Sequence, residues 1–167
     1  MRKTNSGMSL LEILVVVAIF AVLGIIVTRS VILTLQGTKK TESLVRAREN
    51  LDYSLNIIER GIRNASAITQ CPNTDQTVIN FLDQDGNPAS FSCINPGSDS
   101  SYLASGSADI RLTTDSVKIL SCSFACTPAG GANPPVVAID LSVQDASASG
   151  IPGSVVTAST QIYLRNY

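Results

Sequence analysis

Residues 7–17 read GMSLLEILVVV, and this stretch decides how the 167-residue chain is interpreted. A short leader with Arg2 and Lys3 precedes it, and apolar residues follow it as far as Val27. Twenty helical residues rise about 30 Å, which matches the hydrocarbon thickness of a bilayer. The sequence therefore predicts one membrane span, with the basic leader in the cytoplasm and the rest of the chain outside.

Glu12 is the one charged side chain between residues 8 and 27. A carboxylate within hydrocarbon costs about 3 kcal/mol unless it finds a partner. A secretory signal has a shorter apolar core and a small-x-small cleavage site, and a plain signal anchor leaves the acid unexplained. The alternative is that Glu12 lies close enough to the membrane boundary to reach the lipid headgroups.

The register of Gly7, Met8 and Glu12 before a long apolar helix resembles the prepilin cleavage and methylation motif of type IV pilin-like proteins. The resemblance implies that a prepilin peptidase cuts between Gly7 and Met8 and that Met8 is then N-methylated. The family most often has Phe at this first mature position. Cleavage leaves an α-amino charge on Met8, and pairing it with Glu12 lowers the cost of burying both charges. The resemblance implies that this pairing joins neighbouring subunits and sets their axial register.

Apolar residues continue at helical spacing after the span, while charged residues occupy the other faces. We expect one helix over residues 9–64, with a break near Gln36 and Gly37 as the alternative. Many proteins of this family have a proline where this chain has Arg29, so the sequence does not decide whether the helix kinks there. The apolar stripe consists of Leu44, Leu51, Leu55, Ile58 and Ile62, at spacings of 7, 4, 3 and 4.

Beyond about residue 65 the chain is rich in small and polar residues, with short apolar alternations that predict an antiparallel sheet. Asp-Gly and Asn-Pro within residues 83–88 predict a hairpin. A second hairpin is expected across the loop of residues 127–135. The expected strands cover residues 77–82, 89–94, 110–113, 117–124, 136–143 and 155–164.

The expected fold class is α+β, a pilin-like lollipop in which a long N-terminal α-helix is packed on a C-terminal antiparallel β-sheet head. Residues 1–7 are the leader that prepilin peptidase removes. Residues 8–28 form the transmembrane, filament-core half of the helix, and residues 29–64 form its amphipathic half. Residues 65–167 form an extracytoplasmic, β-rich head.

Two further segments are similar to J-type minor pseudopilins and related minor pilins. Residues 58–65, IERGIRNA, look like the segment that closes the long helix in that group, although Gly61 stands where an acid is usual. Residues 117–143 and the final QIYLRN of residues 161–166 are similar to its C-terminal half. This resemblance implies a minor subunit that initiates or caps a filament.

Four cysteines follow the predicted span, on the side of the membrane where disulfides persist. They allow three connectivities, of which we favour Cys71 with Cys93 and Cys122 with Cys126. The second bridge requires a bend, because four extended residues span about 13 Å while bridged Cα atoms lie about 5.5 Å apart. A four-cysteine zinc site is the alternative, but neither close pair has the usual two intervening residues.

The composition argues against an enzyme, because the chain contains no histidine, the commonest general base. Residues 83–87 place oxygen ligands around a glycine, but the glutamate that completes a calcium loop is missing, so a hairpin turn is favoured. No phosphate loop or nucleophile elbow is present. Twelve Lys and Arg balance 13 Asp and Glu, which gives no basic surface for nucleic acid. We expect no catalysis, cofactor, metal or nucleic-acid contact.

The sequence thus predicts a structural subunit, a minor pilin or pseudopilin, of a type IV pilus or type II secretion-like filament. The implied partners are prepilin peptidase, other subunits, an inner-membrane assembly platform and, before assembly, membrane lipid. The implied location is a single-pass membrane protein with an exported head, later an extracellular or periplasmic filament. One alternative is a single-span membrane-anchored surface protein with a small binding head, which would keep residues 1–7. The other is a secreted or anchored hydrolase, for which the sequence supplies no catalytic residues.

Overall fold

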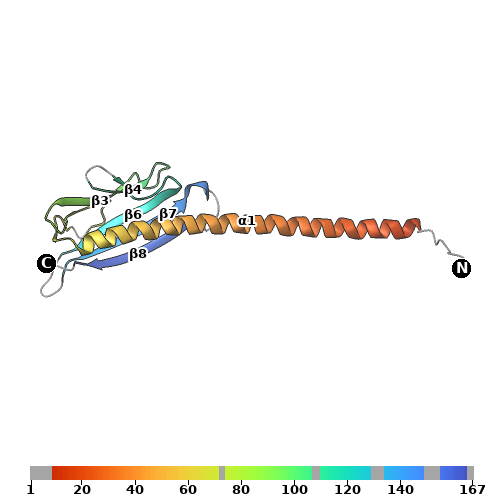
Figure 1. Ribbon diagram of the computed structural model, residues 1–167, viewed down its shortest axis with the longest axis horizontal. Coiled ribbons are helices and arrows are strands. Elements are labelled where there is room, and N and C mark those ends of the chain that lie inside the picture. The colour runs from red at the N-terminus through yellow and green to blue at the C-terminus, as the bar shows by residue number, and fades with distance from the viewer. Residues whose placement is uncertain (1–8, 72–73, 107–109, 129–133, 149–154, 165–167) are drawn as a thin grey trace. The chain divides into compact units, whose positions relative to one another are not determined.

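A computed structural model of the chain describes residues 9–71, 74–106, 110–128, 134–148 and 155–164 (Figure 1). Contacts within the chain divide it into two units, Met1–Lys39 and Lys40–Tyr167. Helix α1 (Leu10–Arg63) contributes its first half to the first unit and its second half to the second. It is helical at Arg29 and at Gly37, so the prediction of one uninterrupted helix is confirmed.

The first unit contains no described element besides α1. The helix begins after Ser9, whose carbonyl oxygen accepts hydrogen bonds from the backbone N–H groups of Glu12 at 3.0 Å and Ile13 at 3.2 Å. Every side chain of residues 10–39 is exposed within the subunit. This half of α1 therefore gains no stability from a core of its own.

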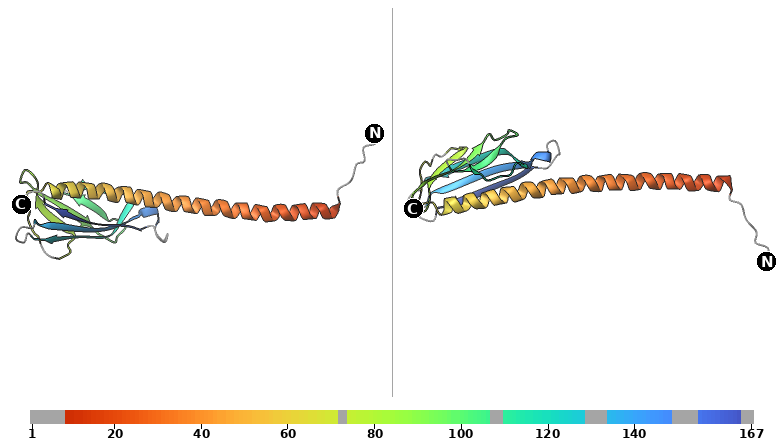
Figure 2. Two further views of the ribbon diagram at one scale, coloured as in Figure 1. Left: turned by 90° about the horizontal axis from the view of Figure 1, so that it is seen from below. Right: turned by 45° about the horizontal axis from the view of Figure 1, so that its top comes forward.

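In the second unit, α1 buries one face against the strands (Figure 2). Three residues of the predicted apolar stripe, Leu51, Ile58 and Ile62, are at most 1 % exposed, whereas Leu44 and Leu55 are half-buried. The sequence interpretation missed the small residues of this face, which keep the helix close to the strands. The buried face consists of Ser43, Ala47, Leu51, Ser54, Ile58 and Ile62.

The strands of the head form two antiparallel sheets where the sequence predicts one. The first hairpin, β2 with β3, and the second, β6 with β7, are confirmed, whereas β1 and β4 were not predicted. The five-stranded sheet has the order β1 (Ala67–Ile68), β2 (Val78–Leu82), β3 (Pro88–Ile94), β4 (Tyr102–Ser105) and β5 (Ile110–Arg111). The three-stranded sheet has the order β6 (Val117–Thr127), β7 (Val136–Asp145) and β8 (Val155–Tyr163).

Two disulfides join the five-stranded part of the head to β6. Cys71 is bonded to Cys126 and Cys93 to Cys122, with Cα–Cα distances of 4.8 and 6.2 Å. The favoured pairing of Cys71 with Cys93 and of Cys122 with Cys126 is therefore wrong. The reason is that β6 remains extended through residues 122–126, so these two cysteines are both buried on one face of the strand and too far apart to bridge.

The hydrophobic core lies between α1 and the two sheets. Phe81 and Phe91 stack with ring centroids 5.3 Å apart. Gly61 permits this packing, because a Cβ atom there would lie 2.9 Å from Cζ of Phe91. The three-stranded sheet contributes buried side chains at alternate positions, among them Val137, Ile139, Leu141, Val143 and Ile162.

Candidate assembly segment and surfaces of the head

Residues 10–35 of α1 present an apolar surface on all sides. The exposed fractions of Leu10, Leu11 and Phe20 are 83, 71 and 70 %. In the described part of the chain, α1 is the one helix long and apolar enough to cross a membrane. A helix that is apolar all round is normally covered by lipid or by other helices. We call residues 10–35 the assembly segment.

Glu12 lies in the first turn of this segment, where the positive end of the helix dipole favours a carboxylate. The backbone N–H of Glu12 is bonded to the carbonyl oxygen of Ser9, which places Glu12 at the third position of the helix. Among the described residues, the Glu12 side chain has no hydrogen-bond or ion-pair partner. The predicted cleavage and methylation sites, Gly7 and Met8, lie outside the described residues.

An ion pair with one buried partner joins the second half of α1 to the end of β7. The carboxylate of Asp145 at the end of β7 is 1 % exposed and accepts a 2.9 Å hydrogen bond from Nε of Arg46. Ser147 donates to the same carboxylate from its backbone N–H at 2.8 Å and from its hydroxyl. Burial raises the pKa of Asp145, but the hydrogen bonds from Ser147 and Arg46 outweigh this effect, so the pKa is below its usual value.

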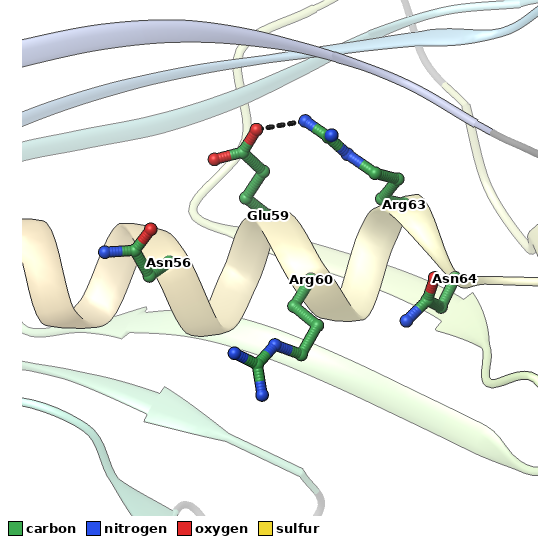
Figure 3. A pocket seen from close by; sticks show the side chains of 5 residues that line it. All are labelled: Asn56, Glu59, Arg60, Arg63 and Asn64. Atoms are coloured by element: carbon green, nitrogen blue, oxygen red, sulfur yellow. Dashed lines mark hydrogen bonds and ion pairs between the residues drawn. The ribbon is translucent and has the colours of Figure 1, made fainter.

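A shallow polar hollow of about 460 Å³ lies at the C-terminal end of α1 (Figure 3). Glu59 and Arg63 form an ion pair on one side of the helix, and Arg60 points to the other side. The remaining lining residues are Asn56 and Asn64. These groups suit polar contacts, but they include no nucleophile with an adjacent base.

Residues 83–87, which have some features of a calcium loop, form the hairpin turn between β2 and β3. Oδ1 of Asp83 accepts hydrogen bonds from the backbone N–H groups of Asp85 at 2.9 Å and Asn87 at 2.8 Å. The bond from the Asn87 backbone is the main reason why the pKa of Asp83 is lowered. Its carboxylate thus stabilises the turn. The residues that the structure describes contain no group of three or more metal-ligating side chains.

In a comparison with protein families, the prokaryotic N-terminal methylation motif matches residues 2–28. This match includes Gly7, Met8 and Glu12 and extends through the apolar start of α1. No curated protein and no solved structure matches the chain.

Proposed function

We propose that this chain, which carries the methylation motif of type IV pilin-like prepilins, is a structural subunit of a type IV pilus or type II secretion-like filament. The motif indicates a pilin- or pseudopilin-type subunit, processed by prepilin peptidase and assembled with other pilin subunits. One observation carries the proposal: an apolar helix, exposed on all sides, contains in its first turn a carboxylate that has no partner among the described residues.

Removal of residues 1–7 would create the cation that this carboxylate needs. Four positions separate the new α-amino group of Met8 from Glu12, which is about 6 Å along the axis of a helix that extends to the new N-terminus. Pairing with the amine of a neighbouring subunit would neutralise both charges while the apolar surfaces cover each other. Before assembly, lipid would cover the same surface in a single-pass precursor whose head is exported.

The finer assignment is a minor subunit that initiates or caps the filament at an inner-membrane assembly platform. It rests on the similarity of residues 58–65 and 161–166 to J-type minor pseudopilins. The structure gives a physical reason for the departure at Gly61, since the ring of Phe91 occupies the space that a side chain would need.

The proposal is tested by the mature N-terminus and by one variant. Mass spectrometry of the protein from cells should find N-methylated Met8 at the start of the chain. Glu12→Ala should be processed and keep both disulfides, yet be lost from sheared filaments. Glu49→Ala is the control, because Glu49 is exposed on the second half of α1, and it should be incorporated normally.

Two results would count against it. Retention of residues 1–7 would leave a single-span surface protein with a small binding head, for which the polar hollow of Figure 3 offers a contact surface. Normal incorporation of Glu12→Ala would refute the charge pairing.

A further inference from the structure

Arg29, like Glu12, is a charged side chain of the assembly segment that has no partner among the described residues. Between residues 9 and 38 the sequence contains two charged side chains, Glu12 and Arg29, which have opposite signs. Arg29 does not mark the end of the apolar surface, because Val31 and Leu33 beyond it are 53 and 68 % exposed. Within the described residues, the guanidinium makes no hydrogen bond or ion pair.

Hydroxyl groups in the same region are satisfied by the helix itself. Thr28 donates to the carbonyl oxygen of Gly24 at 2.8 Å, and Thr34 donates to that of Ser30 at 2.9 Å. Such bonds allow a hydroxyl to lie in apolar surroundings. A guanidinium always carries its charge and cannot be satisfied in this way, so it needs an external anion wherever water is excluded.

We propose that, where two copies of this chain pack side by side, Arg29 of one copy pairs with Glu12 of the other. The inference rests on the proposed filament function in its general form, a filament in which copies of this chain adjoin one another, and not on the finer assignment of an initiating or capping subunit. The two residues are 17 positions apart, so the pairing requires parallel helices staggered by about 25 Å. Helices packed without stagger would place like charges against each other, which is unfavourable. The Glu12 carboxylate has two oxygens, so it can accept from Arg29 of one neighbour and from the α-amino group of a different neighbour, whose axial offset is about 6 Å.

The same stagger covers apolar surface that a bilayer does not reach. The assembly segment is 26 residues long, or about 39 Å, against a hydrocarbon thickness of about 30 Å. Val31 and Leu35, at its distal end, are 53 and 58 % exposed. A shift of 17 positions places residues 14–18 of the second copy beside residues 31–35 of the first. Charge pairing and apolar burial therefore favour the same axial offset.

Charge variants of the full-length chain test the role of Arg29. Arg29→Gln should reduce the fraction of the chain in sheared filaments about tenfold, which corresponds to about 1.4 kcal/mol. Arg29→Lys should restore most of it, and Arg29→Glu should abolish it. Lys39→Gln is the matched control, because Lys39 is an exposed cation outside the assembly segment, and it should be incorporated normally. All variants should keep N-methylated Met8 and both disulfides.

Cysteine cross-linking tests the stagger itself. Copies with Ile13→Cys and copies with Ser30→Cys, produced together, should form a disulfide-linked dimer in filaments, because these positions are also 17 apart. Copies with Ile13→Cys and Leu23→Cys, at an offset of about 15 Å, should not. The four native cysteines are already bridged and do not compete.

Each outcome decides between the two proposals. Cross-links at another offset, cross-links only to a different subunit, or normal incorporation of Arg29→Gln would overturn the stagger. If Glu12→Ala still failed to assemble, the filament function would stand. Absence of the wild-type chain from filaments, or retention of its leader, would overturn both.

Discussion

The Nε atom of Arg46 on α1 donates a hydrogen bond of 2.9 Å to Oδ2 of Asp145, the last residue of β7. The two residues lie 99 positions apart in the sequence. Arg46 also forms an ion pair with Glu42, so one guanidinium links an exposed acid to a buried one. The second half of α1 is thereby held to the end of the three-stranded sheet by an ion pair as well as by apolar packing.

Replacement of Arg46 by Met should destabilise the head. The Asp145 carboxylate would stay buried with only the hydrogen bonds from Ser147, and we expect a loss of about 1–3 kcal/mol in the free energy of unfolding. Urea denaturation of the full-length chain in mild detergent, followed by circular dichroism, measures this loss. Arg48→Met is the control, because Arg48 and Asp52 are both exposed and 3.9 Å apart. Equal losses in the two variants would contradict the role of Asp145.

The stability of the head should depend on pH through Asp145. Its pKa in the folded state is below the usual 3.8, so its charged form stabilises the fold above that value. This stabilisation should be lost as the pH falls below about 4 and through the folded-state pKa. Asp145→Asn should show a weaker loss over the same range in denaturation at a series of pH values. Identical pH profiles for both proteins would refute this assignment.

Gly61→Ala should destabilise the protein although alanine favours helices by about 1 kcal/mol. The added methyl would lie 2.9 Å from Cζ and 3.0 Å from Cε2 of Phe91, a buried ring that stacks on Phe81. We expect a net loss of about 1–2 kcal/mol in urea denaturation, because overpacking outweighs helix propensity.

A second substitution controls for this effect. Phe91→Leu removes the ring, so Gly61→Ala should cost less in that background. Gly37→Ala meets no atom within 4 Å and should not destabilise. Destabilisation by Gly37→Ala to the same extent would show that the contact with Phe91 is not the cause.

The disulfide connectivity predicts two different results for paired serine variants. Cys93→Ser with Cys122→Ser removes one bridge and should lower the free energy of unfolding by about 3.5 kcal/mol in the chain-entropy model. Cys71→Ser with Cys93→Ser should instead leave Cys122 and Cys126 as two free thiols. Maleimide labelling of the unreduced, denatured protein counts these thiols. A bridge between Cys122 and Cys126 would contradict the structure.

Local features of the sequence predicted local features of the fold. The spacing of Leu51, Ile58 and Ile62 predicted the buried face of α1, and the turn residues within 83–88 predicted the first hairpin. The disulfides and the contact between Arg46 and Asp145 depend on which strands face each other, which periodicity does not reveal. The assembly segment likewise has features that the sequence predicts and features that only the structure reveals. The charge at Glu12 was evident from the sequence, whereas its place in the first turn became clear only from the first residue of the helix.

The disulfide pattern limits when the two disulfides of the head can form. Cys71 and Cys93 precede β6, and each is joined to a cysteine within that strand. If the head crosses the membrane behind the span, as proposed, Cys71 and Cys93 emerge before Cys122 and Cys126. Oxidation at that time could join only Cys71 to Cys93, and thiol exchange would then have to undo this bond. In the proposed exported head, late oxidation or an isomerase at the point of emergence is therefore a condition for the correct disulfides.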